Sequence, residues 1–158
     1  MEFDFLRKHY PDKSITLGTD EYGCAFAEIE TEGEPVTVWY EERDSQPYMV
    51  CFSFQHIHCF DKEDALEWTE SFLSGEKSAI EFFIGDRPGF GGDIDSVRPE
   101  NFTAEYLKST WINDYLFSRA IPENLICKVR SVKKEFCFDA SIGTDGIVTV
   151  YDKSGENT

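Results

Sequence analysis

The N-terminal part of the chain alternates apolar and polar residues in the period-2 pattern of half-buried β-strands. Residues 22–31 and 36–42 both alternate in this way, and the four residues between them, 32–35 (EGEP), are typical of a turn. The pattern therefore predicts a β-hairpin across these residues. Upstream, the spacing of apolar residues predicts a short helix over residues 1–10 and a short strand over residues 14–17.

The run at residues 48–60 is apolar on both of its alternating faces. A strand with two apolar faces is typical of the middle of a sheet, so we expect one central strand here. A helix should follow, because Asp61 is a suitable N-cap and Gly75 stands just past the end of an apolar stripe. The stripe consists of Ala65, Leu66, Thr69, Phe72 and Leu73. Residues 78–84 then resume the strand pattern.

The C-terminal half opens with a segment rich in glycine and proline. Residues 85–101 hold four glycines and two prolines, and we expect them to form a loop. Beyond the loop the pattern predicts a second helix, a hairpin with a basic turn and a last strand, at residues 103–119, 125–140 and 147–151. Together these elements predict an α+β fold with a mostly antiparallel sheet of about seven strands and two or three helices. The length favours a single domain over residues 1–158, with residues 152–158 as a frayed tail.

Composition agrees with a globular chain that has an aromatic core. The 158 residues are 41% hydrophobic and include 14 phenylalanines, which excludes a disordered acidic chain. Five cysteines, an odd number without a CxxC pair, indicate free thiols, and the charged N-terminus has no signal-peptide pattern. No apolar run approaches the roughly 20 residues of a membrane span. We therefore expect a cytoplasmic protein.

The formal net charge of −16 is concentrated in the first half of the chain, since residues 1–79 carry −12 and residues 80–158 carry −4. Such a charge disfavours binding to nucleic acid and to anionic membranes, both of which select Lys and Arg. The densest stretch is residues 19–44, where nine carboxylates accompany Arg43 alone. The nine are Asp20, Glu21, Glu28, Glu30, Glu32, Glu34, Glu41, Glu42 and Asp44.

On the predicted hairpin these carboxylates would form one acidic ridge with Glu32 and Glu34 at its tip. Like charges at close range are unfavourable without a counter-charge, so the ridge suits a basic protein partner. Trp39 and Tyr40 interrupt the acids, and one of the two must face the less buried side, where an aromatic residue makes a good hot spot of binding; we take Trp39 as that residue. The alternative is an outer face that is merely solvated, and the sequence does not decide between the two.

Two further places have residues suited to chemistry. His56 and His58 share one face of the predicted strand and would suit a metal ion or a small hydrolytic site. Cys59 points to the opposite face from His58, which argues against a Cys–His nucleophile, and we expect no metal and no cofactor. The glycine-rich loop is expected to form a second edge of the binding surface through Asp86, Phe90, Asp93 and Asp95.

The chain resembles the immunity proteins of bacterial toxin–immunity pairs, such as those of contact-dependent growth inhibition and other polymorphic toxin systems. The resemblance rests on a small acidic α+β architecture, the absence of a catalytic motif, and a strand–helix–strand unit at CFSFQHIHCFDKEDALEWTESFLSGEKSAIEFF. It implies a non-enzymatic inhibitor that binds a cognate basic toxin domain, often a nuclease, and blocks its active site; no functional residue is carried over. Two alternatives stay open: a small metal-binding or hydrolytic enzyme, and an acidic scaffold or regulatory module.

Overall fold

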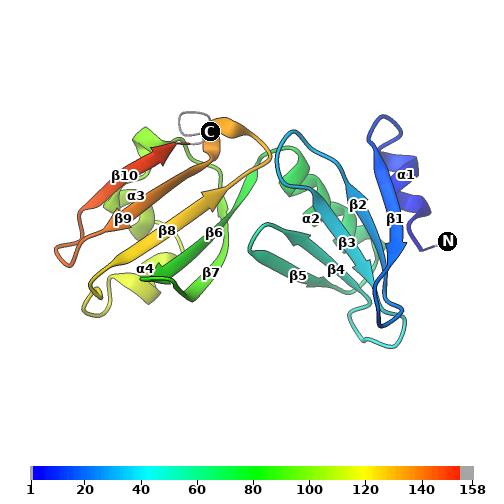
Figure 1. Cartoon of the computed structure of the whole chain (residues 1–158), viewed down its shortest axis with the longest axis horizontal. Helices are drawn as coiled ribbons and strands as arrows, with labels where there is room; N and C mark the ends of the chain where they lie inside the picture. Colours follow the sequence, from blue (N-terminus) through cyan, green and yellow to red (C-terminus); the bar gives the residue numbers. More distant parts are fainter. Residues whose placement is uncertain (1, 154–158) are drawn as a thin grey trace.

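Ten β-strands form two antiparallel sheets in the computed structural model, which describes residues 2–153. The first sheet follows the chain in the order β1-β2-β3-β4-β5, and the second has the order β10-β9-β8-β6-β7. Figure 1 shows the two sheets side by side, the first built by the N-terminal part of the chain and the second by the C-terminal part. The predicted α+β class with antiparallel strands is confirmed.

The first part of the chain supplies two helices and five strands. They are α1 (Asp4–His9), β1 (Ile15–Thr19), β2 (Ala25–Ile29), β3 (Val36–Tyr40), β4 (Tyr48–Phe52), β5 (Gln55–Cys59) and α2 (Lys62–Leu73). The second part supplies β6 (Lys77–Ile84), β7 (Arg87–Asp95), the 3-10 turn η1 (Pro99–Asn101), α3 (Ala104–Lys108), α4 (Ile112–Leu116), β8 (Leu125–Arg130), the 3-10 turn η2 (Lys134–Phe136), β9 (Phe138–Ile142) and β10 (Val148–Lys153).

Helices α1 and α2 cover one face of the first sheet. Val50 of β4 is fully buried there, and Phe72 of α2 stacks on Phe52 with ring centroids 5.3 Å apart. Helix α2 begins where the sequence predicts, because the Asp61 side chain accepts a hydrogen bond from the Asp64 amide at 2.8 Å. The alternation of β2, β3 and β4 thus places their apolar residues on the helix side.

Helices α3 and α4 cover one face of the second sheet. Leu107 of α3 and Ile112 of α4 pack with Phe82 of β6 and Phe138 of β9 in one buried cluster. Each sheet therefore has a hydrophobic core of its own. Ala79 of β6 belongs to the core of the first sheet, so the two cores adjoin.

The two sheets meet where the edge strands β5 and β7 come together. The side-chain nitrogen of Gln55 donates to the Ile80 carbonyl oxygen and to the Glu81 carboxylate, both at 3.1 Å. Phe54 lies edge-on against Phe83, with ring centroids 5.9 Å apart. These contacts bind the β4–β5 turn to strand β6.

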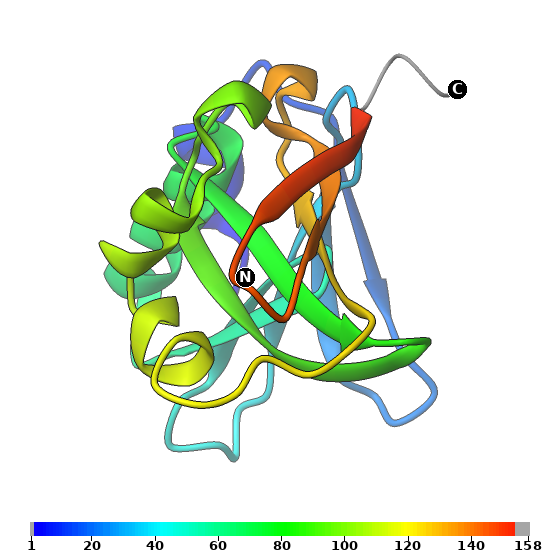
Figure 2. The same ribbon diagram turned by 90° about the vertical axis from the view of Figure 1, so that its left-hand side faces the viewer.

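The four α-helices of the described residues lie on one side of the molecule and the strands on the other, as Figure 2 shows. Each sheet therefore has a face that no helix covers, which we call its outer face. Within residues 2–153, no helix is both long enough and apolar enough to cross a membrane.

The expectation of about seven strands is too low, and residues 48–60 are the first reason. They form the hairpin β4–β5 rather than one central strand, because the chain reverses at Ser53 and Phe54. Ser53 has a φ of +53°, which tight hairpin turns require at this position and which glycine usually supplies. The turn therefore leaves no conventional signal in the sequence.

Residues 85–101 are the second reason, since they are not a loop. Most of them form β7, which pairs with β6. The glycines of this strand make room for side chains that pack on it: a Cβ at Gly92 would lie 2.6 Å from the Trp111 ring. Glycine here marks close packing rather than a break in the strand.

The single helix expected over residues 103–119 is divided into α3 and α4. Between them the Thr110 hydroxyl donates to the Leu107 carbonyl at 2.7 Å and accepts from the Ile112 amide at 3.2 Å. A hydroxyl that bonds the local backbone in this way competes with the helical ladder. The described residues therefore contain four α-helices rather than two or three.

The C-terminal hairpin is confirmed as β8–β9, with the 3-10 turn η2 in its connection. The expected frayed tail falls mostly on residues 154–158, which lie outside the described residues. Its first two residues, Asp152 and Lys153, are part of β10 and pair with β9.

Candidate partner-binding surface

Five residues from five strands form a row across the outer face of the first sheet. The register pairs Gly18 with Phe26, Phe26 with Trp39, Trp39 with Met49, and Met49 with His58. The Phe26 ring covers Gly18, where a Cβ would come within 2.5 Å of it, and its centroid lies 4.9 Å from that of Trp39. This row is an apolar strip on a face that no helix covers.

Successive turns of an antiparallel meander lie at opposite ends of the sheet, so the nine carboxylates fall into separate groups. The β1–β2 turn and the β3–β4 loop share one end, the lower right of Figure 1. We call their carboxylates the acidic end: Asp20, Glu21, Glu41, Glu42 and Asp44. The opposite end, at the β2–β3 turn, carries Glu30, Glu32 and Glu34, and Glu28 lies between on the outer face. The expected single ridge is thus corrected to two acidic groups that flank the outer face.

The loops of the acidic end are held by their own carboxylates. Asp20 Oδ1 accepts hydrogen bonds from the amides of Tyr22 at 2.9 Å and Cys24 at 2.8 Å. Asp44 Oδ1 accepts one from the amide of Gln46 at 2.9 Å. An Asp side chain that bonds the backbone two residues on fixes a tight turn. These hydrogen bonds therefore hold the backbone of both loops of the acidic end in defined turns.

Glu41 joins the two loops. Its Oε1 accepts from the Arg43 amide at 3.1 Å, and its Oε2 accepts from the Cys24 thiol at 3.3 Å. The Arg43 amide, and after it the Cys24 thiol, lowers the pKa of the Glu41 carboxyl. The bond to Glu41 is likewise the main cause that raises the pKa of the Cys24 thiol. At neutral pH Glu41 is therefore ionised and Cys24 is a neutral thiol.

A cavity of about 320 Å³ opens at the acidic end, beside the apolar row. It is lined by Asp20, Cys24, Trp39, Tyr40, Glu41, Asp44, Gln46, Pro47, Met49 and His58. Trp39, which was expected to face the less buried side, lies on the outer face and forms part of the wall. Three carboxylates thus surround a cavity whose other residues are mostly apolar.

None of the nine carboxylates of residues 20–44 forms an ion pair with a basic side chain that the structure describes. Arg43 lies among them in sequence, yet only its backbone amide bonds to Glu41. The ion pairs of the described region lie in the second sheet, where Lys77 and Arg130 bind aspartates. Eight of the nine carboxylates are exposed, and Asp20 is half-buried. The first sheet therefore presents negative charge without its own counter-charge.

The side chains expected to form a second edge of the surface belong to the second sheet and do not join the acidic end. Asp86 lies in the β6–β7 turn. Phe90 is half-buried, stacked between Phe82 and Tyr115 with ring centroids 4.5 and 5.5 Å away. Its role in the structure is packing between β7 and α4.

Asp93 and Asp95 are both bound by one cation. The Lys77 ammonium lies 2.8 Å from an Asp95 oxygen and 3.8 Å from an Asp93 oxygen. Burial raises the pKa of Asp93, and Lys77 opposes that rise. These aspartates have a described cationic partner within the chain, unlike the carboxylates of the acidic end.

His56 and His58 share the outer face, as the sequence predicts, with ring centroids 5.5 Å apart. Cys59 is buried on the opposite face, and the thiol across from His56 is that of Cys51. Burial raises the pKa of Cys51 to about 11, so it is protonated at neutral pH and poorly suited as a nucleophile. No group of three His, Cys, Asp or Glu side chains placed to hold a metal ion occurs among the described residues.

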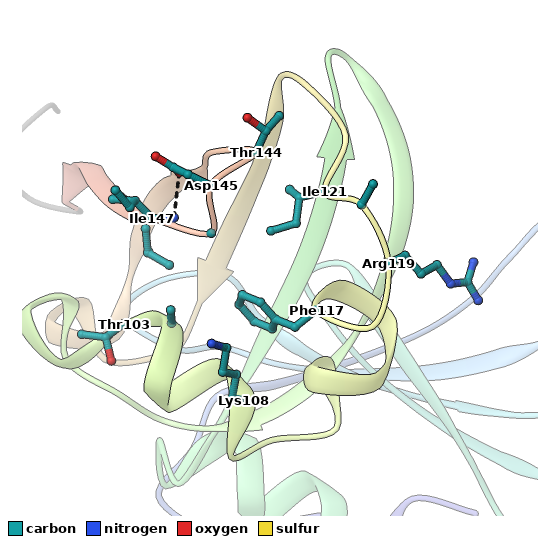
Figure 3. Close-up of a pocket in the computed structure, with 12 residues that line it drawn as sticks. Thr103, Lys108, Phe117, Arg119, Ile121, Thr144, Asp145 and Ile147 are labelled. Carbon is teal, nitrogen blue, oxygen red and sulfur yellow. Dashed lines mark hydrogen bonds between the residues drawn. The ribbon is translucent and has the colours of Figure 1, made fainter.

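Another cavity, of about 490 Å³, lies between helix α3, the segment that follows α4 and the β9–β10 turn (Figure 3). The Lys108 ammonium lies 5.0 Å from the centroid of the Phe117 ring, and Asp145 Oδ1 accepts from the Ile147 amide at 3.0 Å. Arg119 extends away from the cavity. The lining holds no His or Cys, and its single carboxylate, Asp145, is bound within the turn.

Comparison with protein-family models, with curated proteins and with solved structures gave no match. Sequence reasoning missed Met49 and His58 as parts of the candidate surface, because it placed residues 48–60 in one strand. A reversal at Ser53 and Phe54 would have paired these two residues across strands β4 and β5. Neither glycine nor asparagine marks this reversal, so the sequence pattern did not predict it.

Proposed function

We propose that this chain is a non-enzymatic immunity protein that binds and neutralises a basic protein toxin in the cytoplasm, through the acidic end and the adjoining outer face of the first sheet. The observation that carries the proposal is that the nine carboxylates, in two groups flanking an outer face with an apolar row and no covering helix, have no described basic partner. A nuclease domain is the favoured toxin class, because its phosphate-binding Lys and Arg side chains would pair with these carboxylates.

Electrostatics supports a basic partner rather than a neutral one. Like charges at this density repel and disfavour the compact state, and a basic partner would relieve that repulsion. Clustered charge of one sign also steers an oppositely charged partner and raises its association rate by roughly 10- to 1,000-fold. The ordered loops around Asp20 and Asp44 reduce the entropy lost on binding.

The mechanism is steric occlusion combined with charge complementarity. Carboxylates of the acidic end would occupy the positions that nucleic-acid phosphates take in a nuclease site, and the outer face would cover the cleft. Neither step requires a catalytic group in this chain. Inhibition should therefore be stoichiometric, and raising the salt concentration should slow association far more than it speeds dissociation.

The proposal is tested first by capturing proteins from the native host at low salt with the purified chain. The expected product is a basic polypeptide whose nuclease or cell-killing activity is blocked by one equivalent of the chain. Recovery of a housekeeping complex instead, with no toxic component, would favour an acidic scaffold and overturn the proposal.

The surface is tested by charge reversal against a matched control. The site variant combines Glu21→Lys, Glu28→Lys and Glu42→Lys, none of which removes a hydrogen bond of the described structure. The control combines Glu63→Lys, Glu67→Lys and Glu105→Lys on the helix side, with the same change in net charge. We expect association with the captured partner to slow by about 10- to 100-fold for the site variant and far less for the control. Equal rates for the two variants would exclude this surface.

A further inference from the structure

We propose that the cavity at the acidic end receives one lysine or arginine side chain of the basic partner and is the anchor point of the complex. This inference rests on the proposed function and deepens it: the carboxylates around the outer face set the association rate, and the cavity sets the lifetime of the complex. The two roles have different kinetic signatures.

The walls of the cavity suit the apolar stem of a long cationic side chain. Trp39 and Met49 are direct cross-strand neighbours, and His58 is paired with Met49 on its other side. Tyr40 and Pro47 complete the apolar lining. A volume of about 320 Å³ is at the small end of the range for ligand pockets, which suits one extended side chain. Lys and Arg bury their methylene stems on such surfaces while the charge stays at the polar rim.

The rim suits the charged head. Asp20, Glu41 and Asp44 contribute three carboxylates, and the lining contains no Lys or Arg. Oδ1 of Asp20 and Oδ1 of Asp44 are bound by backbone amides, so these two carboxylates are fixed in place. Their Oδ2 atoms have no donor among the described residues and remain open as acceptors. Charged hydrogen bonds to such oxygens are stronger than neutral ones.

The occupant is a side chain of a partner rather than a metal ion. The described residues contain no group of three ligating side chains close enough to hold a metal. A guanidinium or ammonium does not need three side chains that meet at one point, because its several N–H donors can bind acceptors that lie apart. The face of Trp39 adds a cation–π attraction that a hydrated metal ion would not gain in the same way. Charge complementarity and the apolar wall thus favour the same occupant.

A titration without the partner tests the cavity itself. The probe is N-acetyl-arginine amide, with N-acetyl-citrulline amide as a neutral control of nearly the same shape. We expect the indole N–H resonance of Trp39, assigned with a Trp39→Phe variant, to shift with the arginine probe at roughly millimolar concentration and not with the citrulline probe. An indole signal that ignores both probes, or follows both equally, would overturn the proposal.

Kinetics with the captured partner test the anchor role. Met49→Lys places the chain's own ammonium in the cavity, and Thr37→Lys adds the same charge to the same face outside it. We expect the Met49→Lys complex to dissociate about 30-fold faster or more, as for a hot-spot residue, and the Thr37→Lys complex to change far less. Trp39→Ala should act like Met49→Lys, and the melting temperature of each variant reports its folding.

The outcomes separate this inference from the function on which it rests. If charge reversal of Glu21, Glu28 and Glu42 slows association but Met49→Lys and Thr37→Lys dissociate alike, the partner surface stands and the anchor does not. If no basic partner is found, both fail. If both rates change as described, the cavity is the anchor.

Discussion

The two sheets of this molecule have similar architectures but differ in how their carboxylates are paired. Each has five antiparallel strands, a core beneath its helices and an uncovered outer face. In the second sheet, Lys77 binds Asp93 and Asp95, and Arg130 binds Asp139 at 2.7 Å. In the first sheet, no described basic side chain pairs with the carboxylates of residues 20–44. Within the described residues, the chain therefore pairs three aspartates of the second sheet with cations and pairs none of the carboxylates of residues 20–44 in this way.

We take this difference as support for a partner-binding surface rather than a merely solvated one. An acidic protein can place cations beside its acids, as Lys77 and Arg130 show, so open charge is not an automatic result of the −16 total. The second sheet also covers an aromatic ring with a cation, since the Lys128 ammonium lies 5.2 Å from the Phe83 centroid. Trp39 of the first sheet has no such cover from a described residue. A basic partner would supply to the first sheet the cations that Lys77, Lys128 and Arg130 supply to the second.

The largest expected effect is at the junction of the two sheets, with Gly91→Ala. A Cβ at Gly91 would lie 2.6 Å from both the Ile80 carbonyl oxygen and the Gln55 side-chain nitrogen, and would also collide with the Glu81 carboxylate. Because a backbone atom must move, we expect a loss of about 3 kcal/mol in the free energy of unfolding. Urea denaturation measures this loss, and amide exchange shows whether both sheets lose protection together.

Gly89→Ala, on the same strand, is the matched control. The nearest atom to its Cβ would be the Phe82 carbonyl oxygen at 3.3 Å, so a far smaller loss is expected. Equal losses for the two variants would show that β7 resists any added side chain, and that the sheet junction is not the cause.

The next largest effect on stability is expected when one charged side chain is removed from each sheet. The guanidinium of Arg130 donates to Asp139 and to the carbonyl oxygens of Val129 and Phe138, and it is only 28% exposed. Arg130→Met leaves a partly buried carboxylate without its cation and should cost about 2 kcal/mol. Glu28→Gln on the first sheet removes an unpaired, exposed charge and should change stability by less than about 0.5 kcal/mol.

Thermal and urea unfolding of both variants at low salt provide the measurement. The comparison of the sheets predicts a loss for Arg130→Met and either no change or a small gain for Glu28→Gln. A clear loss for Glu28→Gln would mean that Glu28 already has a stabilising partner within the chain, and the contrast between the sheets would be lost.

Local pattern was sufficient for the elements whose signals lie in adjacent residues. The hairpin β2–β3, the N-cap of α2 and the shared face of His56 and His58 follow from alternation and capping. The cavity could not be predicted in this way, because it depends on which strands are neighbours and on a turn at Ser53 that contains neither glycine nor asparagine. The division of the acids between two ends depends likewise on the meander. Register and topology are long-range properties, and a single sequence does not display them.

The smallest effect on stability is expected at two tight turns, one in each sheet. Ser53 opens the two-residue turn of β4–β5 with a φ of +53°, and Gly85 opens that of β6–β7 with a φ of +65°. A side chain at positive φ is strained, and the buried Ser53 hydroxyl has no hydrogen-bond partner among the described residues. Ser53→Gly places glycine at the positive-φ position of the β4–β5 turn, as Gly85 is placed in the β6–β7 turn. After the entropy cost of glycine, it should raise the free energy of unfolding by about 0.5–1 kcal/mol.

The reciprocal change, Gly85→Ser, should lower the free energy of unfolding by about 1 kcal/mol, because it introduces the same strain where glycine now avoids it. Urea denaturation of both variants at equal salt gives the two values. A destabilised Ser53→Gly variant would show that the Ser53 side chain has a stabilising role in the β4–β5 turn. That turn sets the pairing of Met49 with His58, so the partner-binding variants at Met49 would then have to be compared in chains with an unaltered Ser53.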